Sequence, residues 1–274
     1  MTDTSAPQQQ EVADFYDESS RFLAEVTGGS LHFGYWTGPS DRSAMGPASQ
    51  RLTDMMIERV RVGPGDRVLD IGCGTGEPAI RLARATGAQV VGITISAVQV
   101  ERANAHAAAA GMADLVSFRH ADAMKLPFQP DSFDGVWLFE SVFHMPNRLE
   151  PLRQAAAVLR PGGRLALTDV LDNSGTPERD DLPYASLFGE SMRIGDYQAL
   201  LQRAGLVEIE ALDITAHTVP RSLASIHHGI EKRREELVAA YGSRMVEQVE
   251  AATTSLEAAG LGYSIVTAER TGGS

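Results

Sequence analysis

The chain has 274 residues, of which 43% are hydrophobic and 22% charged, a composition typical of a globular protein with one sizeable domain. Its formal net charge of −12 argues against a nucleic acid or an anionic membrane surface as a partner, and leaves small molecules or proteins. Cys73 is the single cysteine, which excludes an intrachain disulfide; with no signal peptide and no apolar run of about 18 residues, we expect a cytoplasmic protein.

The first 62 residues predict a polar tail followed by helices. Residues 1–12 are rich in Ser, Gln and Pro, which is typical of a disordered tail. Apolar residues recur at helical spacing over 12–27 and over 48–62, and the aromatic, turn-rich stretch 31–46 indicates an ordered loop. We therefore expect a disordered tail at 1–12 and an N-terminal helical cap at 13–62.

Beyond this cap, short apolar runs alternate with helical patterns. Such alternation implies parallel strands with helices covering both faces of the sheet. The fold class that we predict is α/β, with a doubly wound, mostly parallel, seven-stranded Rossmann-like sheet. Its strands are expected at 67–72, 89–95, 115–123, 133–141, 164–171, 206–215 and 261–271.

Two segments interrupt this regularity and are natural material for a helical lid. Residues 172–195 are polar and rich in turn formers, and residues 216–260 contain a long helical stretch. We therefore expect one domain at 63–274 with lid insertions at about 172–195 and 216–260. The helical lid is equally compatible with a dimerisation surface, so a homodimer or higher homo-oligomer is possible.

The stretch VLDIGCGTGEPA at 68–79 places glycines at 72, 74 and 76, directly after an apolar run. The G-x-G-x-G spacing differs from the dinucleotide fingerprint G-x-G-x-x-G, and the Gly-Lys-Ser/Thr ending of a phosphate-binding loop is missing. In an open α/β sheet, this first turn is where a ligand usually binds. The loop therefore suits close backbone approach by a ligand, and an NAD(P)-dependent oxidoreductase is a weak alternative.

Three motifs together resemble class I S-adenosylmethionine-dependent methyltransferases. DIGCGTG resembles their motif I, HADAMKLPFQPDSFDGVWLFESVFHM resembles the adenine-binding and fourth-strand motifs, and LRPGGRLALTDV resembles the fifth-strand region. With LHFGYW and ITISAVQ, the pattern is most similar to bacterial natural-product methyltransferases, including sugar O-methyltransferases. The resemblance covers roughly 12–171 and implies a methyltransferase of secondary metabolism, such as antibiotic biosynthesis, with S-adenosyl-L-methionine as cofactor and a small-molecule acceptor.

The resemblance also implies which residues hold the cofactor. Gly72 and Gly74 would let the backbone lie against the methionine part, and Asp70 would face the ammonium directly or through water. Asp122 would accept from the adenine amino group while Ala123 supplies a backbone N–H. Asp70 and Asp122 also have purely structural alternatives, as a cap of the loop amides and as a turn residue.

The ribose site departs from the common pattern, because the second strand ends without an acidic residue. Thr94, Ile95 and Gln99 occupy that place, and a neutral Gln/Thr pair can still hydrogen-bond a diol. The remaining residues that the resemblance places around the cofactor are Glu140 at the end of the fourth strand and, from the N-terminal side, Tyr16, His32 and Tyr35.

His144 is the predicted general base, since its imidazole titrates near neutrality and it follows the fourth strand. Related sugar methyltransferases have a His-His pair here, and this chain has Phe143 at the first position. Asp169, at the end of the fifth strand, would orient His144 or bind substrate. O-methylation is favoured, N- or C-methylation and a noncatalytic cofactor-binding protein stay open, and no metal is expected.

Overall fold

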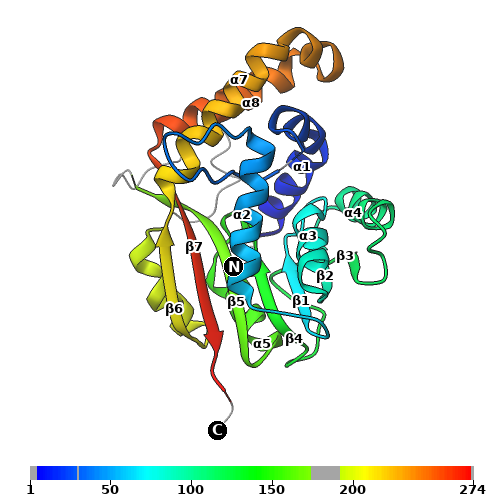
Figure 1. Cartoon of the computed structure of the whole chain (residues 1–274), viewed down its shortest axis with the longest axis vertical. Coiled ribbons are helices and arrows are strands. Elements are labelled where there is room, and N and C mark those ends of the chain that lie inside the picture. Colours follow the sequence, from blue (N-terminus) through cyan, green and yellow to red (C-terminus); the bar gives the residue numbers. More distant parts are fainter. Residues whose placement is uncertain (1–4, 30, 174–191, 273–274) are drawn as a thin grey trace.

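The structure is a computed structural model that describes residues 5–29, 31–173 and 192–272. Its centre is a seven-stranded sheet of order β3-β2-β1-β4-β5-β7-β6, with β7 antiparallel to both of its neighbours (Figure 1). This confirms the predicted mostly parallel α/β sheet. The strands are β1 (Arg67–Ile71), β2 (Gln89–Thr94), β3 (Val116–His120), β4 (Phe133–Leu138), β5 (Leu159–Asp172), β6 (Leu206–Asp213) and β7 (Leu261–Arg270).

Helices cover both faces of this sheet, as a doubly wound fold requires. On one face Leu52, Leu82 and Ala103 join a buried cluster, and on the other face Leu152 and Leu201 join a second one. These residues come in turn from α2 (Met45–Val60), α3 (Glu77–Thr86), α4 (Ala97–Ala109), α5 (Leu149–Val158) and α6 (Tyr197–Arg203). The helices α2, α3 and α4 therefore share one face, while α5 and α6 lie on the other.

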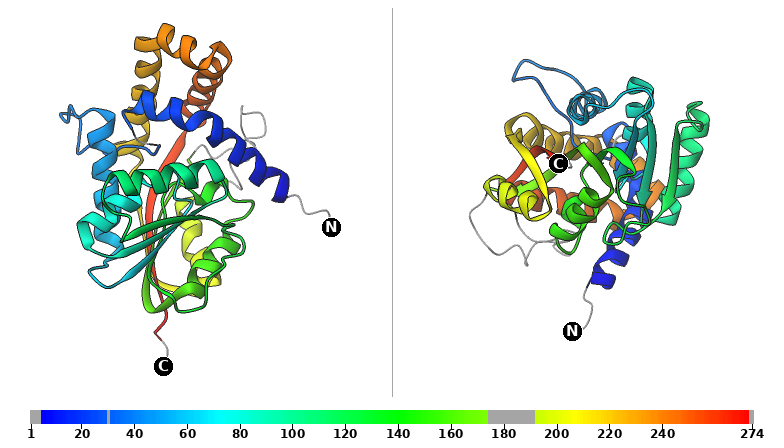
Figure 2. Two further views of the ribbon diagram at one scale, coloured as in Figure 1. Left: turned by 90° about the vertical axis from the view of Figure 1, so that its right-hand side faces the viewer. Right: turned by 90° about the horizontal axis from the view of Figure 1, so that it is seen from below.

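Three further helices form a roof over the carboxyl ends of the parallel strands (Figures 1 and 2). The roof consists of α1 (Ser5–Thr27), α7 (Thr215–Tyr241) and α8 (Ser243–Ala258). Phe22 of α1 packs with Ile226 and Ile230 of α7 and with Val246 of α8 in a separate apolar cluster. The predicted long helical stretch is thus a pair of helices, α7 and α8, which occupies the segment between β6 and β7.

The N-terminal end differs from the expected disordered tail, because α1 already begins at Ser5. Pro7 lies within the first turn, where the missing N–H of proline costs little. The three glutamines that follow are good helix formers, so helical residues extend into the polar segment. Residues 1–4 lie outside the described residues, and so does most of the first predicted lid segment, at 174–191.

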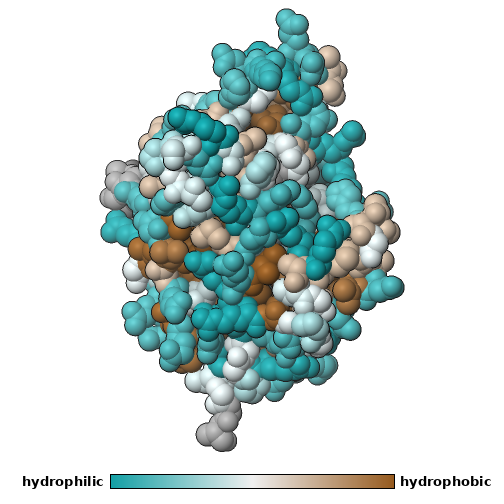
Figure 3. All heavy atoms as spheres, in the orientation of Figure 1, coloured by the Kyte–Doolittle hydropathy of each residue, from teal (hydrophilic) through white to brown (hydrophobic). Residues whose placement is uncertain are grey.

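The surface is mainly hydrophilic, as the 22% of charged residues in the chain leads one to expect. Figure 3 shows a face covered mainly by hydrophilic residues, with apolar residues in small patches between them. The exposed large hydrophobic residues in the described part of the chain are Val207 and Leu212, both on the edge strand β6. Within the described residues, no helix is both long and apolar enough to cross a membrane.

Candidate active site

The first cavity lies where the carboxyl ends of the parallel strands meet α1, and it has an empty volume of about 1080 Å³ that is partly open to solvent. Open α/β sheets bind ligands at this edge. The cavity brings together most of the predicted site residues, while Tyr35, Asp70 and Asp169 are not on its wall. The predicted residues that line it are Tyr16, His32, Gly72, Gly74, Thr94, Ile95, Gln99, Asp122, Ala123, Glu140 and His144.

The glycine loop forms the floor of this cavity. The amides of Gly72 and Cys73 both donate to the Ile93 carbonyl at the end of β2, at 2.8 and 2.9 Å. Gly72 has φ +80°, and a Cβ built on it would lie 2.3 Å from the Cβ of Ser141. A side chain at this position would therefore be strained both by its backbone conformation and by its neighbour.

Asp70 lies beneath the loop and is 2% exposed. Its Oδ1 makes no hydrogen bond with the described residues, and Nε1 of Trp137 is also unsatisfied, although the indole lies close enough to favour the ionised carboxyl slightly. Burial raises the pKa of Asp70 to about 7 against that smaller effect of Trp137. The alternative role of Asp70, capping the loop amides, is not seen among the described residues, so a buried carboxylate oxygen without a donor remains beside the floor.

At the end of β2, a chain of hydrogen bonds orients the predicted ribose-binding residues. The Thr94 hydroxyl donates to the side-chain Oε1 of Gln99 at 2.7 Å, and the backbone N–H of Gln99 donates to the Ser96 hydroxyl at 2.9 Å. Ser96 thereby caps α4 and also bonds the Asp17 carboxylate of α1. Sequence reasoning missed Ser96 and Asp17; the serine before the α4 pattern was a visible N-cap signal, but its contact with α1 was not.

The loop after β3 supplies the third side of the cavity. Oδ1 of Asp122 accepts from the backbone N–H of Met124 at 2.8 Å, which fixes the turn. Ala123 lies beside Asp122 on the cavity wall. Asp122 therefore both fixes this turn and lines the cavity.

Glu140 stands at the boundary between the first cavity and a second one. It has φ +49° two residues after β4 ends, and its backbone N–H donates to the Thr168 hydroxyl at 2.9 Å. Its Oε1 accepts from the Phe33 backbone N–H at 2.7 Å and from the Tyr263 hydroxyl at 2.5 Å. Burial raises the pKa of Glu140 to about 7, against the two donors that favour its ionised form.

His144 belongs to the short helix η1 (Val142–His144) and meets Tyr16 of α1 at the same boundary. Its Nε2 lies 2.8 Å from the Tyr16 phenol oxygen, and the two rings pack edge to face with centroids 5.3 Å apart. Burial, and next the charge of Glu140, raise the pKa of Tyr16, so its phenol is neutral and can donate to the imidazole. The pair forms the wall between the cavities.

The second cavity, with an empty volume of about 980 Å³, lies between the roof and the ends of β5 and β7. Both cavities share the side chains of Tyr16, Leu31, His32, Glu140 and His144. Burial lowers the pKa of His32 to about 4 despite its hydrogen bond to the Phe33 carbonyl, so His32 is neutral. The described residues contain no group of three or more His, Cys, Asp or Glu that could hold a metal ion.

Asp169 is not beside His144, contrary to the expectation that it orients this residue. It is fully buried and accepts from Nε of Arg148 at 2.7 Å and from the Tyr197 hydroxyl. Side chains alternate between the two faces of a strand, and Asp169 shares the side of Leu167 and Leu171, which pack with α5 and α6. Its carboxylate therefore serves an internal ion pair.

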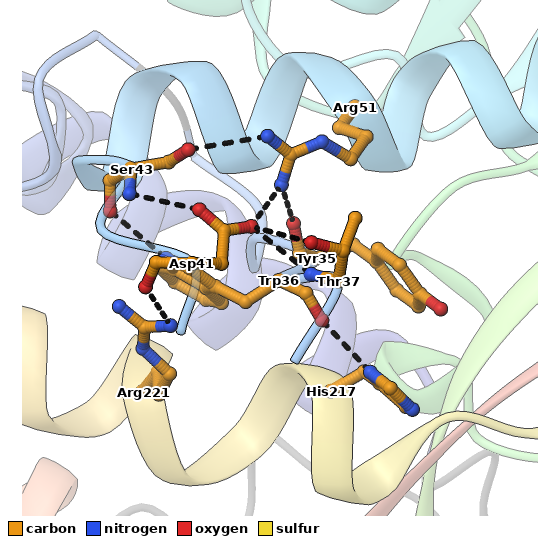
Figure 4. A network of polar contacts seen from close by, with 8 residues as sticks. All are labelled: Tyr35, Trp36, Thr37, Asp41, Ser43, Arg51, His217 and Arg221. Atoms are coloured by element: carbon orange, nitrogen blue, oxygen red, sulfur yellow. Dashed lines mark hydrogen bonds and ion pairs between the residues drawn. The ribbon is translucent and has the colours of Figure 1, made fainter. Parts of the chain in front are cut away.

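Tyr35 is also held away from the cavity, because it belongs to a strap, residues 31–44, that is fixed to α2 and α7 (Figure 4). Its ring stacks on His217 of α7, with centroids 5.0 Å apart and planes inclined by 14°. Asp41 accepts from the Thr37 and Ser43 amides and from Arg51, while His217 lies 2.8 Å from the Trp36 carbonyl. This contact joins residues 181 positions apart, which no local pattern could indicate.

Comparisons with known proteins identify methyltransferases as relatives of this chain. Residues 68–163 match the model of a methyltransferase domain. The chain is 44% identical to 27-O-demethylrifamycin SV methyltransferase of Amycolatopsis mediterranei over 78% of this chain and 80% of that protein. It is 37% identical to (+)-O-methylkolavelool synthase of Herpetosiphon aurantiacus over 91% of this chain and 89% of that protein.

Solved structures extend the likeness to the whole fold. The crystal structure of the 4+2 cyclase SpnF matches with a TM-score of 0.87 and 32% identity, and covers 98% of this chain and 99% of that one. Methyltransferase structures in complex with S-adenosyl-L-methionine or S-adenosyl-L-homocysteine also match, at 20–21% identity. At that level of identity they show the shared fold alone.

Proposed function

The chain belongs to the S-adenosylmethionine-dependent methyltransferases, and from this premise we propose that it methylates a hydroxyl oxygen of a small-molecule intermediate in secondary metabolism. The observation that carries the proposal is the meeting of a glycine-floored cavity with the His144–Tyr16 pair at one edge. The names of the two relatives support oxygen as the methylated atom. The cytoplasmic location and a homo-oligomeric state stay predictions.

The first cavity fits the methionine part of S-adenosyl-L-methionine. Gly72 and Gly74 present backbone without side chains to the cavity, and Asp70 below them has a buried oxygen that lacks a donor among the described residues. When bound, the cofactor supplies an electrophilic methyl group on a sulfonium. We infer that Asp70 binds the ammonium of the cofactor's methionine part, directly or through a water, while the backbone at Gly72 and Gly74 contacts the rest of the methionine part.

The other predicted cofactor residues line the same cavity. Gln99, held by Thr94, and the neighbouring Ile95 would bind the ribose, for which the Gln99 amide nitrogen is a suitable donor. Asp122 and Ala123 would bind the adenine edge. Tyr16 and Glu140 would border the methyl group, because they lie where the first cavity meets the second.

His144 would accept the proton of the acceptor hydroxyl. Nε2 is the nitrogen that faces Tyr16, so the acceptor hydroxyl must either replace the phenol there or donate through it. Nε2 would take the O–H proton as the acceptor oxygen receives the methyl group, which the bound cofactor would supply as it becomes a neutral thioether. The imidazolium then returns its proton to water, which restores the base.

The test is release of S-adenosyl-L-homocysteine in the presence of a panel of hydroxylated acceptors. For an active acceptor, His144→Ala should lower kcat by about 10²–10⁴-fold, the usual contribution of a general base. Calorimetric affinity for S-adenosyl-L-homocysteine should stay within about twofold, since the residue lies at the edge of the site. Full turnover in this variant would contradict the assignment of the base and would favour an amine or carbon acceptor.

The likeness to SpnF gives a second candidate, a 4+2 cyclisation on the same fold. The specific observation is 32% identity over nearly the whole chain. The same assay separates the two activities: a substrate that is cyclised without release of S-adenosyl-L-homocysteine would favour the cyclase, whereas a mass gain of one methyl group would favour the methyltransferase.

A further inference from the structure

We propose that the second cavity binds the body of the methyl acceptor, and that this body is uncharged and mainly hydrocarbon, with its hydroxyl directed at His144. The inference rests on the proposed function and names the substrate class of that site. The cavity fits the role because it adjoins the cofactor cavity, since Tyr16 and His144 line both.

The wall of the second cavity is apolar away from this junction. Leu223 and Ile226 come from α7, Val249 and Leu256 from α8, and Val170 from β5. Burial of apolar surface is favourable roughly in proportion to its area. A hydrocarbon body would therefore gain affinity along this wall, whereas each unpaired hydroxyl of a polyol would lose it.

The two threonines on this wall do not change its character. Thr27 donates to the Leu23 carbonyl and Thr253 to the Val249 carbonyl, both at 2.7 Å, so each hydroxyl proton is used within its own helix. Among the described residues, the remaining hydrogen-bonding side chains that line the cavity are those at the junction, namely Tyr16, His32, Glu140 and His144. Polar recognition is thus concentrated at one end, where a single acceptor hydroxyl would lie.

The charges of the lining residues also favour an uncharged acceptor. Glu140 is the one carboxylate among the described residues that line the cavity, and none of those lining residues is Lys or Arg. A phosphate or carboxylate on the acceptor would lose its hydration without gaining a cation, and would meet an acidic side chain. The described part of the wall therefore disfavours phosphorylated sugars, diphosphates and free sugars as acceptors, despite the resemblance of the sequence to sugar O-methyltransferases.

The first experiment uses the full chain saturated with S-adenosyl-L-homocysteine, so that only the second cavity is open, and Nile red as a neutral polycyclic probe. Fluorescence titration should give micromolar binding. Ala252→Phe, which fills the cavity wall, should weaken binding by about tenfold or more. The matched control Ala251→Phe places the same ring on the exposed side of α8 and should change binding by less than about twofold.

The second experiment displaces Nile red with 1-decanol, decanoate and decyl phosphate, which share one tail and differ in head-group charge. Decanol should displace the probe at a concentration at least about tenfold lower than decyl phosphate. Absence of Nile red binding, equal effects of the two phenylalanine variants, or preference for the phosphate would each overturn the inference. Calorimetry with S-adenosyl-L-homocysteine is independent of these results. Absence of binding in that measurement would instead contradict the proposed function.

Discussion

The two cavities are built from different kinds of structure. The first is made by loops that directly follow β1, β2, β3 and β4, so the paired strands fix its backbone. The second is made largely by side chains of α1, α7 and α8, which come from opposite ends of the chain. The proposed cofactor site is thus fixed by the sheet, whereas the proposed acceptor site has a wall that depends on how helices pack.

The largest expected effect concerns the ion pair beneath the sheet-built cavity. Asp169 and Arg148 are 0% and 6% exposed, and removal of one partner leaves a buried charge uncompensated. Arg148→Met should lower the free energy of unfolding by about 3–5 kcal/mol in urea denaturation. The double variant R148M/D169L should recover most of this loss. Unchanged stability with lost turnover would instead return Asp169 to a catalytic role.

The glycine floor should tolerate substitution at one position and not at the other. Gly72→Ala places a Cβ 2.3 Å from Ser141 at φ +80°, so we expect a loss of about 2–4 kcal/mol in unfolding free energy and a large loss of S-adenosyl-L-homocysteine affinity. Gly74→Ala is the matched control, because its nearest neighbour is 3.8 Å away, and it should cost only about 1 kcal/mol. Equal costs at both positions would refute the crowding argument.

The buried carboxyls predict a pH dependence of stability. Burial raises the pKa values of Asp70 and Glu140 from 3.8 and 4.5 to about 7, so the folded cofactor-free chain holds protons that the unfolded chain releases. Stability should therefore fall as the pH rises from 5 to 8. Asp70→Asn should add of the order of 2 kcal/mol at pH 8 and weaken S-adenosyl-L-homocysteine binding.

In wild type, binding of S-adenosyl-L-homocysteine should instead strengthen as Asp70 ionises near pH 7. This opposite slope separates the two effects in one set of titrations. If the unfolding free energies at pH 5 and pH 8 agree in wild type, the two carboxyls are ionised in the folded chain at both pH values. The statement that Asp70 is protonated in the folded, cofactor-free chain below about pH 7 would then be wrong.

The smallest effect tests the link between sheet and roof at Ser96. Ser96→Ala removes the N-cap of α4 and the bond to Asp17, and should cost about 1 kcal/mol of unfolding free energy. Asp17→Ala keeps the cap and removes only the bond to α1, so it should cost less. Amide hydrogen exchange of α1 should rise in both variants, and protected amides there would show that the link to Ser96 does not hold the roof.

The same difference explains what the sequence could predict. The sheet, its strand positions and the glycine loop follow from local periodicity and spacing, and most residues placed on them do line the first cavity. Asp169 was misplaced because β5 is buried on both faces, so hydrophobicity does not tell which face a residue occupies. Tyr35 was misplaced because its partner His217 is distant in sequence. No sequence motif indicated the apolar second cavity.

The α7–α8 pair leaves and re-enters the sheet at adjacent points. The Ile214 amide donates to the Tyr263 carbonyl, and the Tyr263 amide donates to the Thr215 hydroxyl, both at 2.9 Å. Both ends of this segment are thus anchored side by side, so its interior can be exchanged as a cassette without disturbing strand pairing. If the second cavity binds the acceptor as proposed, a chimera joined at Thr215 and Leu261 should shift acceptor preference toward that of the relative that supplies α7 and α8.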